Sequence, residues 1–429
     1  MKKKQRKIIS AVVFMLSVAV IIIGFFLMTN TDGKPVSPVQ TGNPGSEPDQ
    51  GSGDGGVQVT DSATIDGMTE DIVNNMTLEE KVGQMFVVGL ENLDTGNGNY
   101  YEFRAITPDM QQTITQYKPG GVIFFSRNIE SREQTKQLIS DLAAASDITL
   151  FFTVDEEGGD VSRIAGNPNM KTTLFPSMEE VGLKQDTEYA YEMGKTIGSQ
   201  IRELGFNVDF APVADVKTNQ LNTEIGNRSF GADPELVSSM VTAVVKGIQE
   251  NDVSATLKHF PGHGNSSEDS HKTAVNVDND LNRLRKVDFV PFRAGIKEGA
   301  DFVMVSHISV SRVTEDTVPA CMSSLMIQTV LRKELGFDGI AITDAMDMGA
   351  ITKYYEPDEA AVNCVEAGMD MILLSTDYQS AYRAVLGAVQ DGKIEETRID
   401  ESVKRIIRVK IKRGLILSDT DLLDSRTGR

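Results

Sequence analysis

The sequence predicts an α/β fold with a single (β/α)8 barrel of the TIM type, preceded by a transmembrane helix and a disordered linker. Short apolar runs rich in β-branched residues alternate with amphipathic helical stretches, and polar residues gather directly after the apolar runs. Eight runs are expected to be strands: residues 85–90, 121–125, 150–154, 208–212, 254–257, 302–306, 340–343 and 371–374. A doubly wound open sheet is the alternative, but no G-x-G-x-x-G motif opens a helix after the first run.

Helix boundaries follow from capping residues and apolar periodicity. Thr77 and Glu80 form the two ends of a capping box, so a helix is expected to begin there. Amphipathic helices are predicted over residues 131–145, 186–204, 234–249 and 325–335. A final helix is predicted to begin with Asp400 as its N-cap and to stop at Gly414.

The N-terminus carries a targeting signal. Basic residues within 1–7 precede an uncharged run at 8–28, whose helical rise of about 31 Å matches a bilayer core. The run is long for a cleavable signal peptide, and the positive flank keeps its start in the cytoplasm. We expect an uncleaved signal anchor with an extracellular catalytic domain; cleavage near Asn30 and secretion is the alternative. A flexible Gly/Pro/Ser linker at 29–62, the catalytic barrel at 63–418 and a tail at 419–429 complete the predicted organisation.

Composition narrows the classes of partner. The 429 residues carry a formal charge of −20, and removing the five basic residues of the N-terminal segment leaves 37 basic against 62 acidic residues. An exported part near −25 argues against nucleic acid, whose phosphates require basic faces. Cys321 and Cys364 are the only cysteines and fall in separate βα units, so we expect two buried thiols, not a disulfide.

All four histidines lie between residues 259 and 307, and three of them belong to one Gly-, Pro- and Ser-rich loop segment at 258–271. Histidines on a loop after a strand are less often core filler than histidines on an apolar helix face. In this loop, Asp269 precedes His271 by two residues. A carboxylate beside an imidazole fixes its tautomer and raises its pKa, which suits general acid–base catalysis.

Carboxylates and arginines also follow predicted strands. Asp344 comes directly after the seventh strand, where a barrel presents catalytic groups, although an isolated Asp there often caps the next helix. Asp347 is a rival for either role. Asp155 follows the third strand, and Arg163 and Arg228 are candidate ligand donors, each of which taken singly is also compatible with a surface ion pair.

Three functions compete for these residues. A metal-dependent amidohydrolase would use the histidines and Asp344 as ligands, but such an enzyme needs a His-x-His pair after the first strand, where this chain has none. A metal-free glycosidase needs one carboxylate nucleophile and one proton donor. A tethered sugar-binding protein without activity is the third. The candidate metal ligands are His259, His263, His271, His307 and Asp344.

The chain resembles glycoside hydrolase family 3, in particular its bacterial β-N-acetylglucosaminidase branch. The resemblance covers about residues 68–417 and rests on MTLEEKVGQMF from Met76, GGVIFF from Gly120, NRSF from Asn227, KHFPGHG from Lys258 and TDAM from Thr343, besides the segment at 155–163. The long loop ending at Asp269 and His271 is similar to the acetylglucosaminidase branch alone and is its most specific signal.

The resemblance implies a role for each matching residue. Asp344 would be the nucleophile of a retaining reaction, and His271 the general acid and then base, polarised by Asp269. The hydroxyls of a terminal GlcNAc would be held by Asp155, Arg163, Arg228, Lys258 and His259. A role for His263 in binding or in loop packing stays open. Asp160 stands where relatives commonly carry Arg or Lys, which favours Arg163 as the ligand contact.

The expected activity is therefore that of an exo-acting, retaining β-N-acetylglucosaminidase on muropeptides or peptidoglycan fragments, with no cofactor and no metal. The alternatives within the family are a β-glucosidase and a β-N-acetylglucosaminide phosphorylase. The absence of tryptophan fits recognition of one terminal sugar in a pocket, without an aromatic platform for a long chain. The sequence makes no prediction of the oligomeric state.

Overall fold

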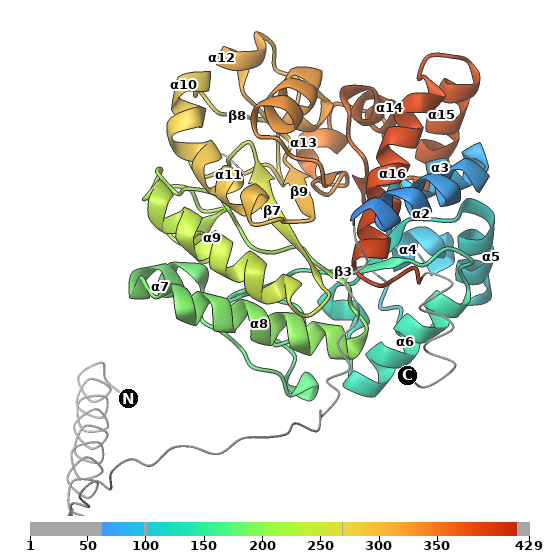
Figure 1. The fold of residues 1–429 in the computed structure, drawn as a ribbon, viewed down its shortest axis with the longest axis horizontal. Coiled ribbons are helices and arrows are strands. Elements are labelled where there is room, and N and C mark those ends of the chain that lie inside the picture. Colours follow the sequence, from blue (N-terminus) through green and yellow to red (C-terminus); the bar gives the residue numbers. More distant parts are fainter. Residues whose placement is uncertain (1–61, 98–100, 268, 418–429) are drawn as a thin grey trace, which may run out of the picture. The chain divides into compact units, whose positions relative to one another are not determined.

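The computed structural model describes residues 62–97, 101–267 and 269–417 (Figure 1). Within these ranges no helix is long and apolar enough to cross a membrane. The predicted anchor at 8–28, nearly all of the linker and the tail at 419–429 lie outside the described residues. All of the described residues belong to one compact unit, Val59–Arg429.

Eight parallel strands form one sheet that is nearly closed into a barrel, as predicted for a TIM-type fold. Strands β1 to β11 follow one another in chain order and β12 pairs with β1, without the reversal of a doubly wound sheet, so the two edges of the sheet are β11 and β12. Between these two edges, Ile342 of β11 and Met371, just before β12, form a parallel bridge, and the Thr343 amide donates to the Met371 carbonyl at 3.0 Å. The strands are β1 (Phe86–Gly89), β2 (Gly121–Ile123), β3 (Phe151–Val154), β6 (Val208–Asp209), β7 (Ser254–Phe260), β9 (Phe302–Val305), β11 (Ile340–Thr343) and β12 (Ile372–Leu373).

These strands match the eight predicted runs, because each is buried along its whole length and must therefore be apolar almost throughout. Four short strands lie in the loops: β4 (Glu156–Gly158) pairs with β5 (Val161–Ser162), and β8 (Val275–Asn276) with β10 (Ile308–Ser309). The β4–β5 hairpin follows β3 directly, so its carboxylates lie at the end of the barrel where the strands finish.

Helices surround the sheet and protect its apolar strands from water (Figure 1). Helices α8 and α9 lie side by side, and their contact is close because Gly194 and Gly198 have no Cβ; one added to Gly194 would lie 2.6 Å from the Val244 carbonyl oxygen. The α-helices are α2 (Ser62–Asn75), α3 (Leu78–Gln84), α4 (Leu90–Leu93), α5 (Pro108–Tyr117), α6 (Arg132–Ala144), α7 (Met178–Lys184), α8 (Thr187–Leu204), α9 (Pro234–Gln249), α10 (Leu281–Arg283), α11 (Phe289–Lys297), α12 (Ser311–Thr314), α13 (Gly349–Thr352), α14 (Pro357–Ala367), α15 (Tyr378–Gln390) and α16 (Glu396–Lys412). Two segments are π-helices, η5 (Leu284–Asp288) and η7 (Leu325–Glu334).

The capping box at the start of α3 is present, with Thr77 and Glu80 satisfying each other's amides. The predicted start of the final helix is wrong: α16 begins at Glu396, and Asp400 lies inside it, 2.7 Å from the Lys81 ammonium. An Asp at that position resembles a cap in sequence, but it serves as the ion-pair partner of a neighbouring helix. Beyond the last turn Gly414 has a φ of 64°, as expected for a helix stop.

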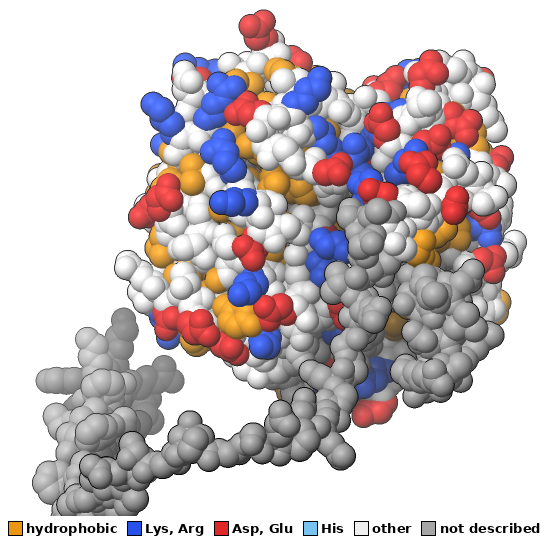
Figure 2. Space-filling model, viewed as in Figure 1, with side chains coloured by type: hydrophobic (Ala, Val, Ile, Leu, Met, Phe, Trp, Pro, Cys, Tyr) orange, Lys and Arg blue, Asp and Glu red, His pale blue; other side chains and the backbone are white. Residues whose placement is uncertain are grey.

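Both cysteines are buried and free, which confirms the prediction of two thiols. The surface mixes charges of both signs: Figure 2 shows basic and acidic side chains spread over the visible face. On this face no single region is exclusively basic.

Candidate active site

The predicted site residues come from five different loops and strands, and most of them meet where the barrel strands end. Asp155 follows β3, Lys258 and His259 belong to the last residues of β7, and Asp344 follows β11. Arg228 ends a single turn of 3-10 helix in the long loop after β6. In a parallel barrel this end collects the catalytic groups of all eight βα loops.

A buried ion cluster joins three of these residues to Glu157. The Lys258 ammonium lies 2.7 Å from carboxylate oxygens of both Asp155 and Glu157. Arg228 donates two hydrogen bonds to Glu157, from Nη2 at 2.7 Å and from Nε at 2.9 Å. The two cations are thereby fixed in position, with donors left over for hydroxyl groups of a ligand.

The charges in this cluster sustain one another. Burial opposes ionisation of Glu157, but Arg228 and Lys258 hold the pKa of its carboxyl well below the usual range. Burial also opposes the charge on Lys258, but Asp155 and Glu157 outweigh it and raise the pKa of the ammonium. Glu157, Arg228 and Lys258 therefore keep their charges around neutral pH.

His259 is oriented by Asp215, a fully buried carboxylate in the loop after β6. Asp215 Oδ2 accepts hydrogen bonds from the His259 amide at 3.2 Å and from His259 Nδ1 at 2.7 Å, while Oδ1 accepts one from the His263 amide. Nδ1 therefore bears the proton that is donated to Asp215. The other ring nitrogen, Nε2, lies 3.4 Å from Nη2 of Arg228. Asp215 thus fixes both the tautomer of His259 and the start of the histidine loop.

Asp344 has the features of a nucleophile. Its backbone amide donates to Val305 in the neighbouring strand, and its Oδ1 accepts the Ala345 amide at 2.8 Å. Oδ2 accepts no hydrogen bond from the residues described. Burial opposes ionisation, but His259 and Lys258 help to hold the pKa of the Asp344 carboxyl below its usual value. The next helix, α13, begins with Met348 as N-cap, so neither Asp344 nor the exposed Asp347 caps it.

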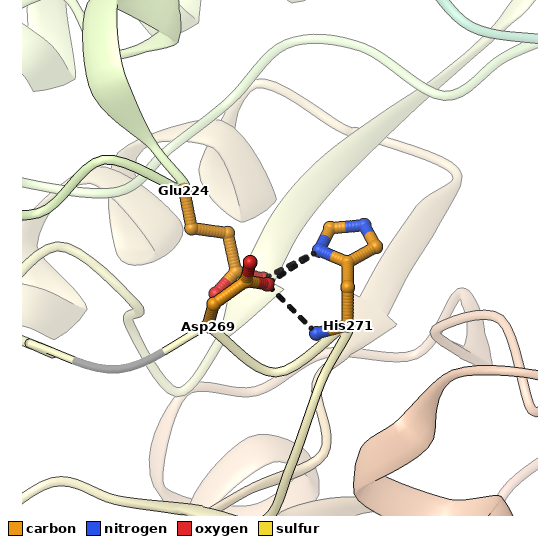
Figure 3. Close-up of side chains that lie close together, drawn as sticks. All are labelled: Glu224, Asp269 and His271. Atoms are coloured by element: carbon orange, nitrogen blue, oxygen red, sulfur yellow. Dashed lines mark hydrogen bonds and ion pairs between the residues drawn. The ribbon is translucent and has the colours of Figure 1, made fainter.

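His271 lies with its Nδ1 toward two carboxylates, as Figure 3 shows. Nδ1 is 3.1 Å from Asp269 Oδ1, which also accepts the His271 amide, and 3.3 Å from Glu224 Oε1. The remaining ring nitrogen, Nε2, points away from both carboxylates (Figure 3). The hydrogen bond to Glu224 raises the pKa of His271 to about 9, and Asp344 and Asp269 act in the same direction. The imidazole therefore carries a proton at neutral pH.

The remaining histidines have packing roles. His263 is buried in the loop, where its ring nitrogens contact the hydroxyls of Ser266 and Ser270, and burial lowers the pKa of the imidazole. His307 Nε2 lies 2.9 Å from the Ala345 carbonyl and Nδ1 lies 3.4 Å from the Cys321 sulfur. Both ring nitrogens of His307 are therefore already engaged by protein atoms.

The ligand set required by the amidohydrolase hypothesis does not come together. Among the residues that the structure describes, the one group with metal-ligand spacing is Glu224, Asp269 and His271. It omits four of the five residues that this hypothesis requires. In these three residues the two carboxylates already contact the His271 imidazole, with Nδ1 at 3.1 Å from Asp269 and 3.3 Å from Glu224.

Arg163 is not bonded to the ion cluster. Its amide donates to the Asp155 carbonyl at 3.4 Å, which places it beside the cluster, and its Nε is buried without a hydrogen-bond partner among the described residues. A buried donor without a partner is suited to a ligand oxygen. Asp160 accepts a hydrogen bond from Asn227.

Three carboxylates at this end of the barrel are absent from the sequence predictions: Glu157, Asp215 and Glu224. Glu157 lies two residues after Asp155, and the other two follow the fourth predicted strand. Their position after strands is the one signal that would have found them. Carboxylates on polar loops otherwise look like solvated surface charges.

Comparison with known proteins gives a consistent result. The model of the glycosyl hydrolase family 3 N-terminal domain matches residues 77–409. Beta-hexosaminidase A of Pseudoalteromonas piscicida is 32% identical over 72% of this chain and 56% of its own length, and beta-hexosaminidase LpqI of Mycobacterium tuberculosis is 31% identical over 77% and 82%. A solved family 3 β-N-acetylglucosaminidase from Paenibacillus sp. str. FPU-7 is 38% identical, with a TM-score of 0.74, over 81% of this chain and 65% of that chain.

This chain thus spans little more than half of the Pseudoalteromonas relative and about two thirds of the Paenibacillus one, but most of the mycobacterial one. The family match covers every strand of the barrel and every site residue described above. The chain belongs to glycosyl hydrolase family 3.

Proposed function

We propose that this protein is a retaining exo-β-N-acetylglucosaminidase that removes terminal β-linked GlcNAc through a covalent glycosyl-enzyme intermediate. The observation that carries the proposal is the pairing of two groups: Asp344, whose pKa is lowered and whose Oδ2 accepts no hydrogen bond from the described residues, and His271, whose pKa is raised and whose Nε2 donates none to them. These are the nucleophile and the proton donor that a retaining glycosidase needs. Relatives with most of their length matched are named beta-hexosaminidases, which supports the choice of sugar.

The reaction takes two steps. In the first, His271 Nε2 gives its proton to the glycosidic oxygen while Asp344 Oδ2 attacks the anomeric carbon, so the aglycone leaves as an alcohol and a glycosyl ester forms. In the second, a water molecule gives its proton to His271 Nε2 and attacks the same carbon, which releases GlcNAc and restores both side chains. Two inversions at one carbon give net retention.

The ion cluster supplies the sugar contacts. Lys258 and Arg228 present donors whose directions are fixed by Asp155 and Glu157, and Asp215 orients the His259 ring beside Arg228. Asp155 is partly exposed, and its carboxylate can accept from vicinal hydroxyls. Rigid donors lose little entropy when a ligand binds, so the terminal sugar is held in one orientation.

The natural substrate proposed is a muropeptide or another peptidoglycan fragment outside the membrane. The support is the sequence of residues 1–62, in which a basic segment, an apolar run and a flexible linker predict a membrane anchor with an extracellular barrel. If the anchor is cleaved, the enzyme is secreted.

The test is digestion of purified muropeptides by the full-length chain, with the released sugar followed by NMR. We expect free GlcNAc that appears first as the β-anomer. Initial release of the α-anomer would contradict a retaining mechanism, and no release from muropeptides but turnover of β-glucosides would favour a β-glucosidase.

The same digest distinguishes the proposed hydrolase from a phosphorylase and from an amidohydrolase. GlcNAc-1-phosphate formed only in the presence of phosphate would show a phosphorylase. Activity lost to a chelator and restored by zinc would favour a metal-dependent amidohydrolase, whereas we expect unchanged activity with a chelator.

A further inference from the structure

Glu224 is the less exposed of the two carboxylates at His271, and it comes from a different part of the chain. Its side chain is 7% exposed, against 30% for Asp269 and 61% for His271. It lies in the loop between β6 and α9, whereas Asp269 belongs to the same loop as the histidine. Glu224 therefore holds His271 from a separate segment of the chain, whereas Asp269 belongs to the same segment as the histidine.

Glu224 holds the histidine loop through several bonds at once. One oxygen accepts the Ser270 amide at 2.8 Å, and the other accepts the Ser270 hydroxyl and lies 3.3 Å from His271 Nδ1. His263, deeper in the same loop, is 3.4 Å from the carboxylate. Breaking these contacts would leave a nearly buried charge without partners, which is costly.

The opposite side of the loop is docked on α13. The Gly349 amide donates to the His271 carbonyl at 3.0 Å, and the Ala350 amide donates to the Ser270 carbonyl at 3.1 Å. The loop is thus fixed from both sides, and the imidazole between them is the part that stays exposed. Glu224 contacts the imidazole itself, whereas α13 contacts only the backbone of the loop.

We propose that Glu224 is a positioning residue, which docks the segment from Asp269 to His271 on the barrel and shares the Nδ1 proton of His271 with Asp269. This inference rests on the acid–base role proposed above for His271. The sequence predicts one carboxylate, Asp269, beside the His271 imidazole, and the proposal adds Glu224 as a second.

The charged groups around His271 are known from each element that contacts it. Glu224 comes from the loop after β6, Asp344 from the end of β11, and Asp269 and Lys272 from its own loop, where Lys272 pairs with Asp269 at 2.7 Å. Lys353, after α13, donates to the Lys272 carbonyl. Among these groups Glu224 has the strongest effect on the proton of His271, so its charge should decide where the imidazole titrates.

The test compares Glu224→Gln with the wild-type chain in pH profiles of kcat/KM for chitobiose, whose leaving group requires protonation. Gln keeps an acceptor for Ser270 but removes the charge, so His271 should lose its proton at lower pH. The basic limb of the profile should move down by about one pH unit or more. With 2,4-dinitrophenyl β-N-acetylglucosaminide, whose leaving group needs no proton, kcat/KM at neutral pH should change less than about threefold.

Two control variants make the result decisive. Glu334→Gln removes the same charge from a carboxylate that pairs with Arg285, and its profile should match the wild type. His271→Ala should abolish the basic limb. An unshifted limb in Glu224→Gln, with the limb absent in His271→Ala, would overturn the role of Glu224 and leave the acid–base assignment intact. A limb that survives in His271→Ala would overturn the acid–base role and this inference with it.

Discussion

At the candidate active site, each charged side chain of the ion cluster contacts one or two side chains of opposite charge. Single substitutions at the site should therefore affect stability and binding in some cases and the catalytic rate in others. In the proposed function, the ion cluster around Glu157 fixes donors for the sugar, while His271 and Asp344 carry out the chemistry. Removal of a cluster member should reduce both stability and binding. Removal of the acid should reduce the rate and leave the fold intact.

Glu157→Gln should destabilise the protein by about 3 kcal/mol, because the buried cations Lys258 and Arg228 would lose the carboxylate charge that both of them contact. The KM for an aryl β-N-acetylglucosaminide should also rise. Urea unfolding and steady-state kinetics measure the two effects. Asp147→Asn is the control, since this carboxylate is an exposed partner of Lys118 and its loss should leave stability nearly unchanged. Equal effects of the two variants would contradict the assignment.

His271→Ala should lower kcat/KM for chitobiose by about 10²–10⁴-fold, which is the usual contribution of a positioned acid. The first step with a dinitrophenyl leaving group should fall far less, because that group leaves without protonation. Thermal unfolding should be nearly unchanged, since most of the imidazole is exposed. Equal losses for the two substrates would show that His271 does not protonate the leaving group.

Among the secondary-structure elements, the start of α13 decides the position of the histidine loop. A Cβ at Gly349 would lie 2.7 Å from the His271 carbonyl oxygen and 2.9 Å from that of Lys272, so a larger residue must push the loop away. Gly349→Ala should therefore lower kcat/KM for chitobiose by about 10²-fold through misplacement of the imidazole.

The matched control is Gly387→Ala in α15, where an added Cβ meets nothing within 4 Å. This variant should keep full activity and gain about 0.5–1 kcal/mol of stability from its helical position. Full activity in Gly349→Ala would contradict the view that the loop must dock on α13.

At the scale of the whole molecule, the last helix, α16, packs against the barrel through a buried lysine. Lys410 of α16 is fully buried, donates to Gln84 Oε1 at 2.6 Å just before β1, and lies over the ring of Phe151 in β3. Burial lowers the pKa of Lys410 from its usual 10.5 to about 7. The unfolded chain therefore binds one more proton than the folded chain between these two values.

Stability should accordingly rise with pH in this window, by about 2 kcal/mol between pH 7 and 9 from Lys410 alone. Urea unfolding of the wild-type chain and of Lys410→Met at both pH values measures the difference. The Met variant should lack this part of the rise. The same rise in both proteins would show that Lys410 is not the group that titrates.

Much of this architecture is predictable from sequence, and the physical reasons are specific. The eight strands are detectable because a parallel strand such as β11 is buried on both faces and so consists of consecutive apolar residues. Asp344, Lys258 and His259 can be selected because they end such strands. The capping box at Thr77 is local and is also predictable.

Contacts between distant segments are not predictable in this way. Glu224 and Ser270 are 46 residues apart, and Glu157 and Arg228 are 71 apart, so no local pattern links them. Asp400 also looks like a helix cap when the sequence is read locally. Its actual ion-pair partner, Lys81, lies near the start of the barrel domain, far away in the sequence. The pairing of a loop carboxylate with a buried cation can be recognised only in the three-dimensional structure, where the barrel brings the ends of its strands together.

The proposed mechanism depends above all on a covalent bond between Asp344 and the sugar. The most direct experiment is to incubate the full-length chain with a slow substrate, 5-fluoro-N-acetylglucosaminyl fluoride, and to locate the bound sugar by mass spectrometry of peptides. We expect one sugar per chain, attached to Asp344, and no label in Asp344→Ala. A label on another carboxylate, or turnover at the wild-type rate by Asp344→Ala, would contradict the mechanism.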